Sequence, residues 1–212
     1  YYPIGGALAS RLSVSDSLRQ YTAEVTGGSV ENVNRLREGQ IDMGFALAVT
    51  VYEAYQGGQD YDNPFTGLRV VAPLYANLVH VLVPRGSTAT SLSELAGARI
   101  SVGSAGSGTE QVARQILEAY GFTYEDVDAR YLTFSESAAS LRDGAIDAAI
   151  LSVGYPAAAV LEATTTGGAR LLPLEMERIE ALRAQYPYYS VGRIPAEAYP
   201  GVVEEIPTVA MM

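Results

Sequence analysis

Apolar residues follow two kinds of spacing along this chain, and the two kinds alternate. Apolar positions at helical spacing, bounded by Ser or Gly, predict helices over residues 5–18, 29–38, 91–96 and 110–120. Short apolar or β-branched runs predict strands over residues 22–25, 41–51, 78–83 and 99–102, the second running into a further helix through Tyr55. Strands that alternate with helices predict an α/β fold.

One short sequence pattern occurs twice. Residues 36–42, Leu-Arg-Glu-Gly-Gln-Ile-Asp, are echoed by residues 141–147, Leu-Arg-Asp-Gly-Ala-Ile-Asp. Each copy is typical of a helix end, a glycine able to adopt a positive φ, and an Ile-Asp entry into an apolar strand. The separation is too long for a solenoid repeat and predicts two similar lobes with a cleft between them. The alternative is that helix–glycine–strand junctions resemble one another in all α/β proteins.

The echo leads to an explicit division of the chain. We expect a first lobe from residues 1–83 together with about 190–212, and a second lobe from residues 84–184. Residues 185–189 are expected to form the hinge region, with a second crossing near Pro84. Ligand binding would then close the hinge, because the cleft is complete only when both lobes touch the ligand.

The segment from Gly103 to Thr109 is the strongest local indication of a ligand site. Its glycines let the backbone approach a ligand, and its hydroxyls lie where the following helix presents unpaired N–H groups and a positive dipole end. This composition favours an anion site, although an ordinary capping loop would contain the same residue types. Neither a Walker A loop nor a dinucleotide-binding fingerprint is present. The loop residues expected to touch the ligand are Ser104, Gly106, Ser107, Gly108 and Thr109.

A shorter version of the same arrangement precedes the helix expected at residues 29–38. Thr26-Gly27-Gly28 forms a turn, and Ser29 is expected to be the N-cap. With one such helix terminus in each lobe, a ligand in the cleft could be held from both sides. Taken alone, the turn is better explained as a simple cap.

Composition narrows the class of protein. The net charge is −10 and the 14 basic residues, all of them Arg, are scattered, which argues against a nucleic-acid partner. No apolar run approaches the length needed to span a bilayer. The chain has no Cys and a single His, which lies inside the apolar run 78–83 and is expected to be structural. Triads and most transition-metal sites are therefore excluded, and we expect no enzyme, no cofactor and no metal.

Five motifs together resemble a known family, the TAXI receptors of TRAP transporters, over essentially the whole chain. The motifs are Tyr-Tyr-Pro-Ile-Gly-Gly at 1–6, Thr-Gly-Gly-Ser-Val-Glu-Asn at 26–32, Val-Gly-Ser-Ala-Gly-Ser-Gly-Thr-Glu at 102–110, Ala-Arg-Gln-Ile-Leu-Glu-Ala-Tyr-Gly at 113–121 and Ile-Pro-Thr-Val-Ala at 206–210.

The resemblance implies a two-lobed type II periplasmic-binding-protein fold in a secreted, extracytoplasmic receptor. It also implies a partner permease driven by an ion gradient, and glutamate, glutamine or a related carboxylate as ligand. Family members usually begin with a strand before the Tyr-Tyr-Pro motif and continue into C-terminal helices. We therefore expect the chain to be a fragment from which the signal peptide, the first strand and those helices are missing. Besides the loop residues named above, the ligand contacts that the resemblance implies are Tyr2, Ser29, Ser152 and Tyr155. We also expect Gly28, Ala46 and Leu47 to line the ligand site.

One departure from the family pattern concerns the ligand. Family members often have Leu-Val-Gln-Ser-Asp after the first Ile-Asp, whereas this chain has Phe-Ala-Leu-Ala-Val at 45–49. Loss of polar groups there favours a 2-oxoacid or dicarboxylate over a zwitterion, unless these residues simply pack in the lobe core. Two alternatives to a transport receptor stay open: a sensory ligand-binding domain of the same fold, and an enzyme built on it.

Overall fold

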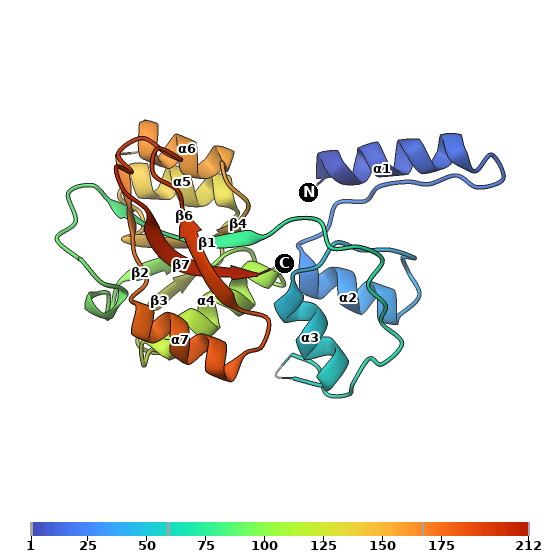
Figure 1. Ribbon diagram of the computed structural model, residues 1–212, viewed down its shortest axis with the longest axis horizontal. Coiled ribbons are helices and arrows are strands. Elements are labelled where there is room, and N and C mark those ends of the chain that lie inside the picture. The colour runs from blue at the N-terminus through green and yellow to red at the C-terminus, as the bar shows by residue number, and fades with distance from the viewer. Residues whose placement is uncertain (1, 59, 167, 212) are drawn as a thin grey trace.

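A seven-stranded mixed sheet organises the second part of the chain in the computed structural model, which describes residues 2–58, 60–166 and 168–211 (Figure 1). The strands are β1 (Asn77–Pro84), β2 (Arg99–Ser101), β3 (Asp128–Arg130), β4 (Ala148–Val153), β5 (Ala169–Leu172), β6 (Ser190–Ile194) and β7 (Ile206–Met211). The helices are α1 (Tyr2–Ser15), α2 (Ser29–Arg37), α3 (Ala48–Gln56), the 3₁₀ turn η1 (Leu92–Glu94), α4 (Gly108–Ala119), α5 (Phe134–Arg142), α6 (Ala158–Thr165) and α7 (Met176–Gln185).

Strand β1 lies at the centre of the sheet, whose order is β3-β2-β4-β1-β7-β6 with β5 also paired to β1. It runs antiparallel to β4, β5 and β7, whereas β2 is parallel to both β3 and β4. Its Leu-Val-His-Val-Leu-Val sequence is buried on both faces, as a central strand requires. Helices α4 and α7 cover one face of the sheet and α5 and α6 the other, so each face has its own apolar core (Figure 1).

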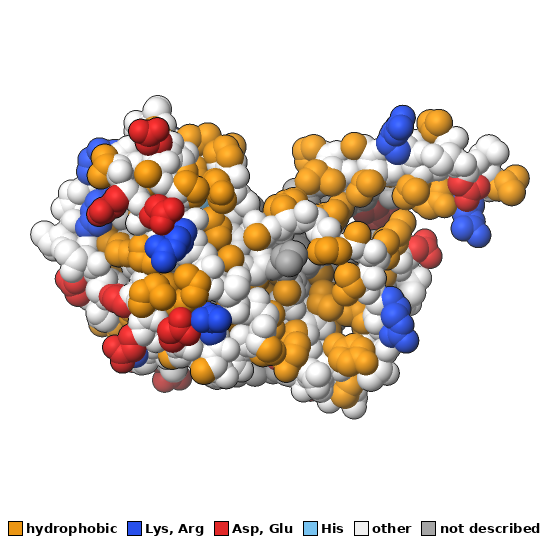
Figure 2. Space-filling model, in the orientation of Figure 1, with side chains coloured by type: hydrophobic (Ala, Val, Ile, Leu, Met, Phe, Trp, Pro, Cys, Tyr) orange, Lys and Arg blue, Asp and Glu red, His pale blue; other side chains and the backbone are white. Residues whose placement is uncertain are grey.

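Residues 2–76 form a looser part beside the sheet, containing α1, α2 and α3 (Figure 1). Their own buried apolar cluster is small and consists of Val33, Ala54 and Tyr61. Many apolar side chains of this part remain on the surface, as Figure 2 shows. The most exposed of these in the extended segments are Val25, Val70 and Val71, at 76%, 71% and 83%.

Helices and strands of the sheet-containing part agree with the sequence, whereas two strands expected in residues 2–76 are absent. The strands predicted over 78–83 and 99–102 and the helix over 110–120 are confirmed within one or two residues. The expected strands at 22–25 and at the start of 41–51 are wrong: neither segment pairs with a described neighbour, and only the helical end of the second forms, as α3. An apolar run becomes a strand only when another strand satisfies its backbone N–H and C=O groups.

Segments assigned by the sequence to two different lobes lie in one sheet. The boundary at residue 83 falls within β1, which pairs over five residues with β4 of the expected second lobe. Strands β6 and β7, grouped by the sequence with the first lobe, belong to this same sheet. No helix in the described ranges is long and apolar enough to cross a membrane.

Candidate functional site

The N-terminus of α2 and the loop that leads into α4 meet directly. The Gly106 carbonyl accepts hydrogen bonds from the backbone N–H groups of Val30 (3.1 Å) and Glu31 (3.4 Å), in the first turn of α2. The first unpaired N–H groups of a helix form its anion-binding end. An oxygen from the second part of the chain therefore lies where an anion would bind to α2.

Two glycines make this approach possible. A Cβ built on Gly28, whose φ is +144°, would lie 2.9 Å from the Ser107 Cα atom. A Cβ on Gly108 would lie 2.8 Å from both the Ser29 Oγ and a methyl group of Leu47. Side chains at either position would push the two segments apart, because real Cβ contacts are longer than this.

Ser29 has a different role from the one expected. The N-cap position of α2 belongs to Gly28, and Ser29 is the first helical residue. The Ser29 Oγ accepts a hydrogen bond from the Leu47 N–H at 3.1 Å, and the side chain is buried. It therefore fixes the start of α3 against α2. The prediction of Ser29 as a cap is wrong because Gly28, with its positive φ, provides the turn into the helix.

The N-terminus of α4 retains free donors. Ser107 caps the helix by accepting from the Glu110 N–H at 3.2 Å, as a Ser at this position should. Within the described residues, no acceptor is paired with the backbone N–H of Gly108 or of Thr109. These two donors point along the positive end of the helix dipole, which favours an anion.

Two hydroxyl groups near this loop also lack partners. The Ser152 Oγ on β4 is buried and unpaired among the described atoms, and Ser152 lies opposite Val79 of β1 in the register. Thr109 is 5% exposed as a residue, but its hydroxyl is not among the fully buried unpaired atoms of the described residues, so this group retains access to the surface. A buried hydroxyl without a partner is unfavourable in an otherwise well-packed protein, so such groups indicate a place for a polar ligand.

The other expected contacts lie in varied places. Ala46 packs beside the small cluster around Val33, and the Ser104 backbone carbonyl accepts a hydrogen bond from the Ser107 N–H within the same loop. Tyr155 follows β4 and is 48% exposed. Tyr2 begins α1, and its side chain lies outside what the structure describes.

The apolar segment expected to face the ligand is mostly core. Leu47 and Val49 are buried in the large cluster that includes Val79 and Val112, so they join α3 to the sheet-containing part. Leu47 still borders the meeting point of α2 and α4 through its contact with Gly108. Its methyl groups make that side of the site apolar.

His80 is structural, as the sequence indicated. Its Nδ1 lies 3.0 Å from the Leu78 carbonyl, which can only accept, so Nδ1 carries the proton. The Nε2 then accepts from the Tyr199 hydroxyl at 3.0 Å. Burial lowers the pKa of His80 to about 4, which keeps the ring neutral. Among the described residues, no three His, Cys, Asp or Glu side chains gather as a metal site would require.

A family model matches the chain over residues 1–212, and it is the model of the NMT1-like family. The chain belongs to the NMT1-like family. This match covers every element that forms the meeting point of α2 and α4.

Solved structures place the NMT1-like chain in a known fold. It is similar to the alkanesulfonate-binding protein SsuA from Xanthomonas axonopodis pv. citri bound to MOPS, with a TM-score of 0.54, 18% identity, and coverage of 99% of this chain and 61% of that one. It is also similar to the arginine-, lysine-, histidine-binding protein ArtJ from Geobacillus stearothermophilus, with a TM-score of 0.53, 15% identity, and coverage of 81% of this chain and 65% of that one. A third similar structure is the periplasmic aliphatic sulphonate binding protein SsuA from Escherichia coli, with a TM-score of 0.51, 18% identity, and coverage of 81% of this chain and 53% of that one.

These similarities confirm the expected fold class. The NMT1-like chain has the mixed α/β fold of type II periplasmic binding proteins. It spans between about half and two thirds of the length of the three structures described above.

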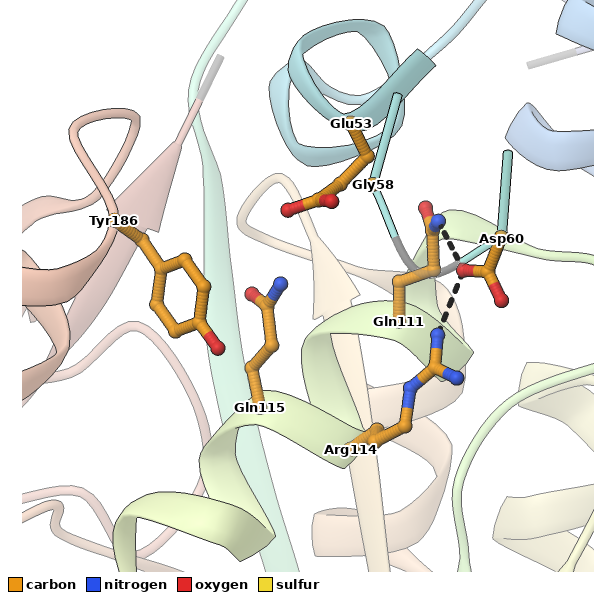
Figure 3. Close-up of a pocket in the computed structure, with 7 residues that line it drawn as sticks. All are labelled: Glu53, Gly58, Asp60, Gln111, Arg114, Gln115 and Tyr186. Carbon is orange, nitrogen blue, oxygen red and sulfur yellow. Dashed lines mark hydrogen bonds and ion pairs between the residues drawn. The ribbon is translucent and has the colours of Figure 1, made fainter. Parts of the chain in front are cut away.

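A second polar region of the NMT1-like chain was not expected from its sequence. A cavity of about 210 Å³ lies between α3, the turn after it, and α4 (Figure 3). Asp60 accepts from Gln111 and from Arg114, each at 2.7 Å. The sequence did contain one indication of this region, because residues 111, 114 and 115 of α4 are polar. They form one side of a helix whose other side, at positions 112, 113, 116 and 117, is apolar and packs in the core. Burial of Gln111 and Gln115 shows that the polar side also faces protein. The lining residues are Glu53, Gly58, Asp60, Gln111, Arg114, Gln115 and Tyr186.

Proposed function

We propose that this chain is the ligand-binding part of an extracytoplasmic solute-binding protein that captures a small carboxylate. The observation that carries the proposal is the meeting of two helix N-termini, α2 and α4, with a carbonyl oxygen already bound to one and free N–H donors on the other. Family and fold support the same function, because the similar structures are binding proteins by name.

A carboxylate fits this site chemically. At the start of α2, the Glu31 carboxylate already accepts the Gly27 N–H at 2.7 Å, so the backbone there binds this group within the protein itself. A ligand carboxylate would use the free N–H groups of Gly108 and Thr109, with the Thr109 and Ser152 hydroxyls as further donors. Charge-assisted hydrogen bonds of this kind are about twice as strong as neutral ones.

The body of the ligand is proposed to be apolar or carbonyl-bearing. Leu47 presents methyl groups at the meeting point. The two described carboxylates there already face a cation, because Glu31 lies 3.9 Å from Arg35 and Glu110 lies 4.0 Å from Arg114, so neither is left to hold an ammonium group. A 2-oxoacid or dicarboxylate is therefore proposed ahead of glutamate or glutamine.

Gly108 lies against Ser29 and Leu47, and Thr109 is buried, so ligand entry requires the N-termini of α2 and α4 to separate. We keep a two-lobed organisation in the proposal but place its hinge in residues 69–76, which join α3 and its following turn to β1. The reason is that motion at Pro84 would break the pairing of β1 with β5, in which Pro84 lies opposite Ala169. Residues 2–76 would then move against the sheet as the site opens.

The proposed partner is a permease of the TRAP type in the cytoplasmic membrane, driven by an ion gradient. Support for this finer assignment is the resemblance of the five sequence motifs, and the secreted location follows from the same resemblance. The ligand is proposed to pass from the closed receptor to this permease.

Titration calorimetry with 2-oxoglutarate, glutamate, glutamine and MOPS tests the proposal. We expect 2-oxoglutarate to bind, and Thr109→Val or Ser107→Ala to weaken its affinity by about ten- to a hundredfold. Ser91→Ala removes a helix cap from η1, which precedes β2 and so lies at the opposite end of that strand from the Gly103–Thr109 loop, and it controls for cap loss. Unchanged affinity in both site variants, or no binding of any carboxylate, would reject the proposal.

A further inference from the structure

The cavity between α3 and α4 contains a carboxylate that the described residues leave without a cation. Glu53 projects from α3 toward Gln115 and Tyr186, as Figure 3 shows. One of its oxygens accepts from the Tyr188 hydroxyl at 3.3 Å, and no described Arg lies within ion-pair distance of it. Among the described residues, the negative charge of Glu53 is therefore met by a single neutral donor.

The other charges in the cavity are already balanced. The Arg114 guanidinium forms its short ion pair with Asp60 at 2.7 Å, and Gln111 donates to the same carboxylate oxygen. Together the three ionised side chains, Glu53, Asp60 and Arg114, leave the cavity wall with one uncompensated negative charge. A half-buried carboxylate in this position is stabilised by a cation, because screening by water is reduced there.

The remaining walls suit an organic cation. Tyr186 lines the cavity as an aromatic side chain, and it stacks on Tyr188, with ring centroids 5.6 Å apart and planes inclined by 27°. Aromatic faces attract ammonium groups within about 6 Å. The Gln115 carbonyl oxygen accepts from the Tyr189 hydroxyl at 2.8 Å and retains a second lone pair. A divalent metal fits less well, since no group of three or more acidic or His side chains gathers in the described parts of the chain.

We propose that this cavity binds a small organic ammonium ion, held by the Glu53 carboxylate beside the Tyr186 ring. The site is separate from the proposed carboxylate site at the N-termini of α2 and α4. Because Glu53 comes from α3 and Tyr186 from the segment between α7 and β6, a bound ammonium ion bridges the two parts of the molecule.

Gly58 determines where the Glu53 carboxylate lies. A Cβ built on Gly58 would be 1.6 Å from the Glu53 Oε2 atom, so any side chain at this position displaces the carboxylate without removing its charge. Gly58 and Glu53 thus provide two independent ways to disrupt the site.

The probe is n-propylammonium chloride, with n-propanol as a neutral analogue of the same size, titrated into the intact chain by calorimetry and by saturation-transfer NMR. We expect one propylammonium ion to bind and propanol not to. Glu53→Gln and Gly58→Ala should each weaken propylammonium binding by about tenfold or more. Glu177→Gln, on the exposed surface of α7, removes the same charge without touching the cavity and should leave the affinity unchanged.

Equal binding of propanol, equal affinity in the wild type and Glu53→Gln, or no binding at tens of millimolar propylammonium would overturn the proposal. Circular dichroism establishes that each variant is folded. Titration of 2-oxoglutarate into Glu53→Gln reports on the carboxylate site separately, so a failure of one site is distinguishable from a failure of the other.

Discussion

The two copies of the echoed sequence, residues 36–42 and 141–147, fold alike at first and then diverge. In both, a helix ends and a glycine follows with nearly the same left-handed φ, +70° at Gly39 and +69° at Gly144. After Ile146 the chain enters β4, between β1 and β2. After Ile41 it continues without a strand partner among the described residues.

The difference lies in the neighbours and not in the local sequence. Ile146 is 2% exposed in an apolar core, whereas Ile41 is half-buried. Helix ends and glycine turns are local structures and form in both places. A strand is stabilised by partners that come from distant parts of the chain, and only the second copy has them.

The largest expected difference between the copies is in hydrogen exchange. Backbone amides of residues 148–153 should exchange at least about a thousandfold more slowly than those of residues 41–46, because the former are paired in a central strand. Mass spectrometry of peptides that cover each segment measures this ratio. Similar protection in both segments would mean that residues 41–46 are paired in solution.

The next largest effect concerns the two isoleucines. Ile146→Ala should lower the free energy of unfolding by about 2–5 kcal/mol, as expected for a fully buried side chain. Ile41→Ala should lower it by less than about 1.5 kcal/mol, since less apolar area is lost. Urea denaturation at constant m-value gives both numbers. Equal losses would contradict the contrast drawn between the copies.

The smallest effect concerns the two aspartates. Asp147 accepts hydrogen bonds from the Arg99 side chain at 2.7 and 2.9 Å and from the Arg99 N–H at 2.9 Å, whereas Asp42 is exposed. Asp147→Asn should lower the free energy of unfolding by only about 1 kcal/mol, because the ion pair of Asp147 with Arg99 is partly exposed to water. Asp42→Asn should change stability by less than about 0.5 kcal/mol.

The effect of Asp147 should depend on pH in a defined direction. Hydrogen bonds from the Arg99 side chain hold the pKa of the Asp147 carboxyl below its usual value. The stabilisation is therefore complete above the pKa of the unfolded chain and is lost as the pH falls through the lower folded value. Urea denaturation of the wild type and of Asp147→Asn measures the difference between their free energies of unfolding. This difference should be smaller in strongly acid solution than at pH 7. A constant difference would exclude this linkage.

The fold of residues 77–211 was largely readable from the sequence because its signals are local. Continuous apolar runs predicted β1 and β2, and Ser91 caps the short helical turn that was expected to begin there. The membership of β6 and β7 in the same sheet was not readable, since pairing between segments more than a hundred residues apart leaves no local pattern.

The candidate site was predicted in part. The glycine-rich loop before α4 contacts the first turn of α2, so the two helix N-termini that the sequence suggested lie next to each other. The sequence did not predict that the Gly106 carbonyl would occupy the donors of α2, and it left open whether Leu47 faces the ligand or packs in the core. Both depend on how the two parts of the molecule approach. The Glu53 cavity was missed because its walls come from segments that are distant in sequence.

The central position of β1 has a consequence for the order of folding. Leu78 pairs with Val153 on one side and with Ala210 on the other. During synthesis of the chain, β1 therefore leaves the ribosome well before the strands that pair with it. At a synthesis rate of roughly 5–20 residues per second, β1 remains unpaired for several seconds at least. Such high contact order slows folding and leaves an apolar strand open to wrong pairing. Strand β1 is therefore exposed to wrong pairing until β4 and β7 have been synthesised.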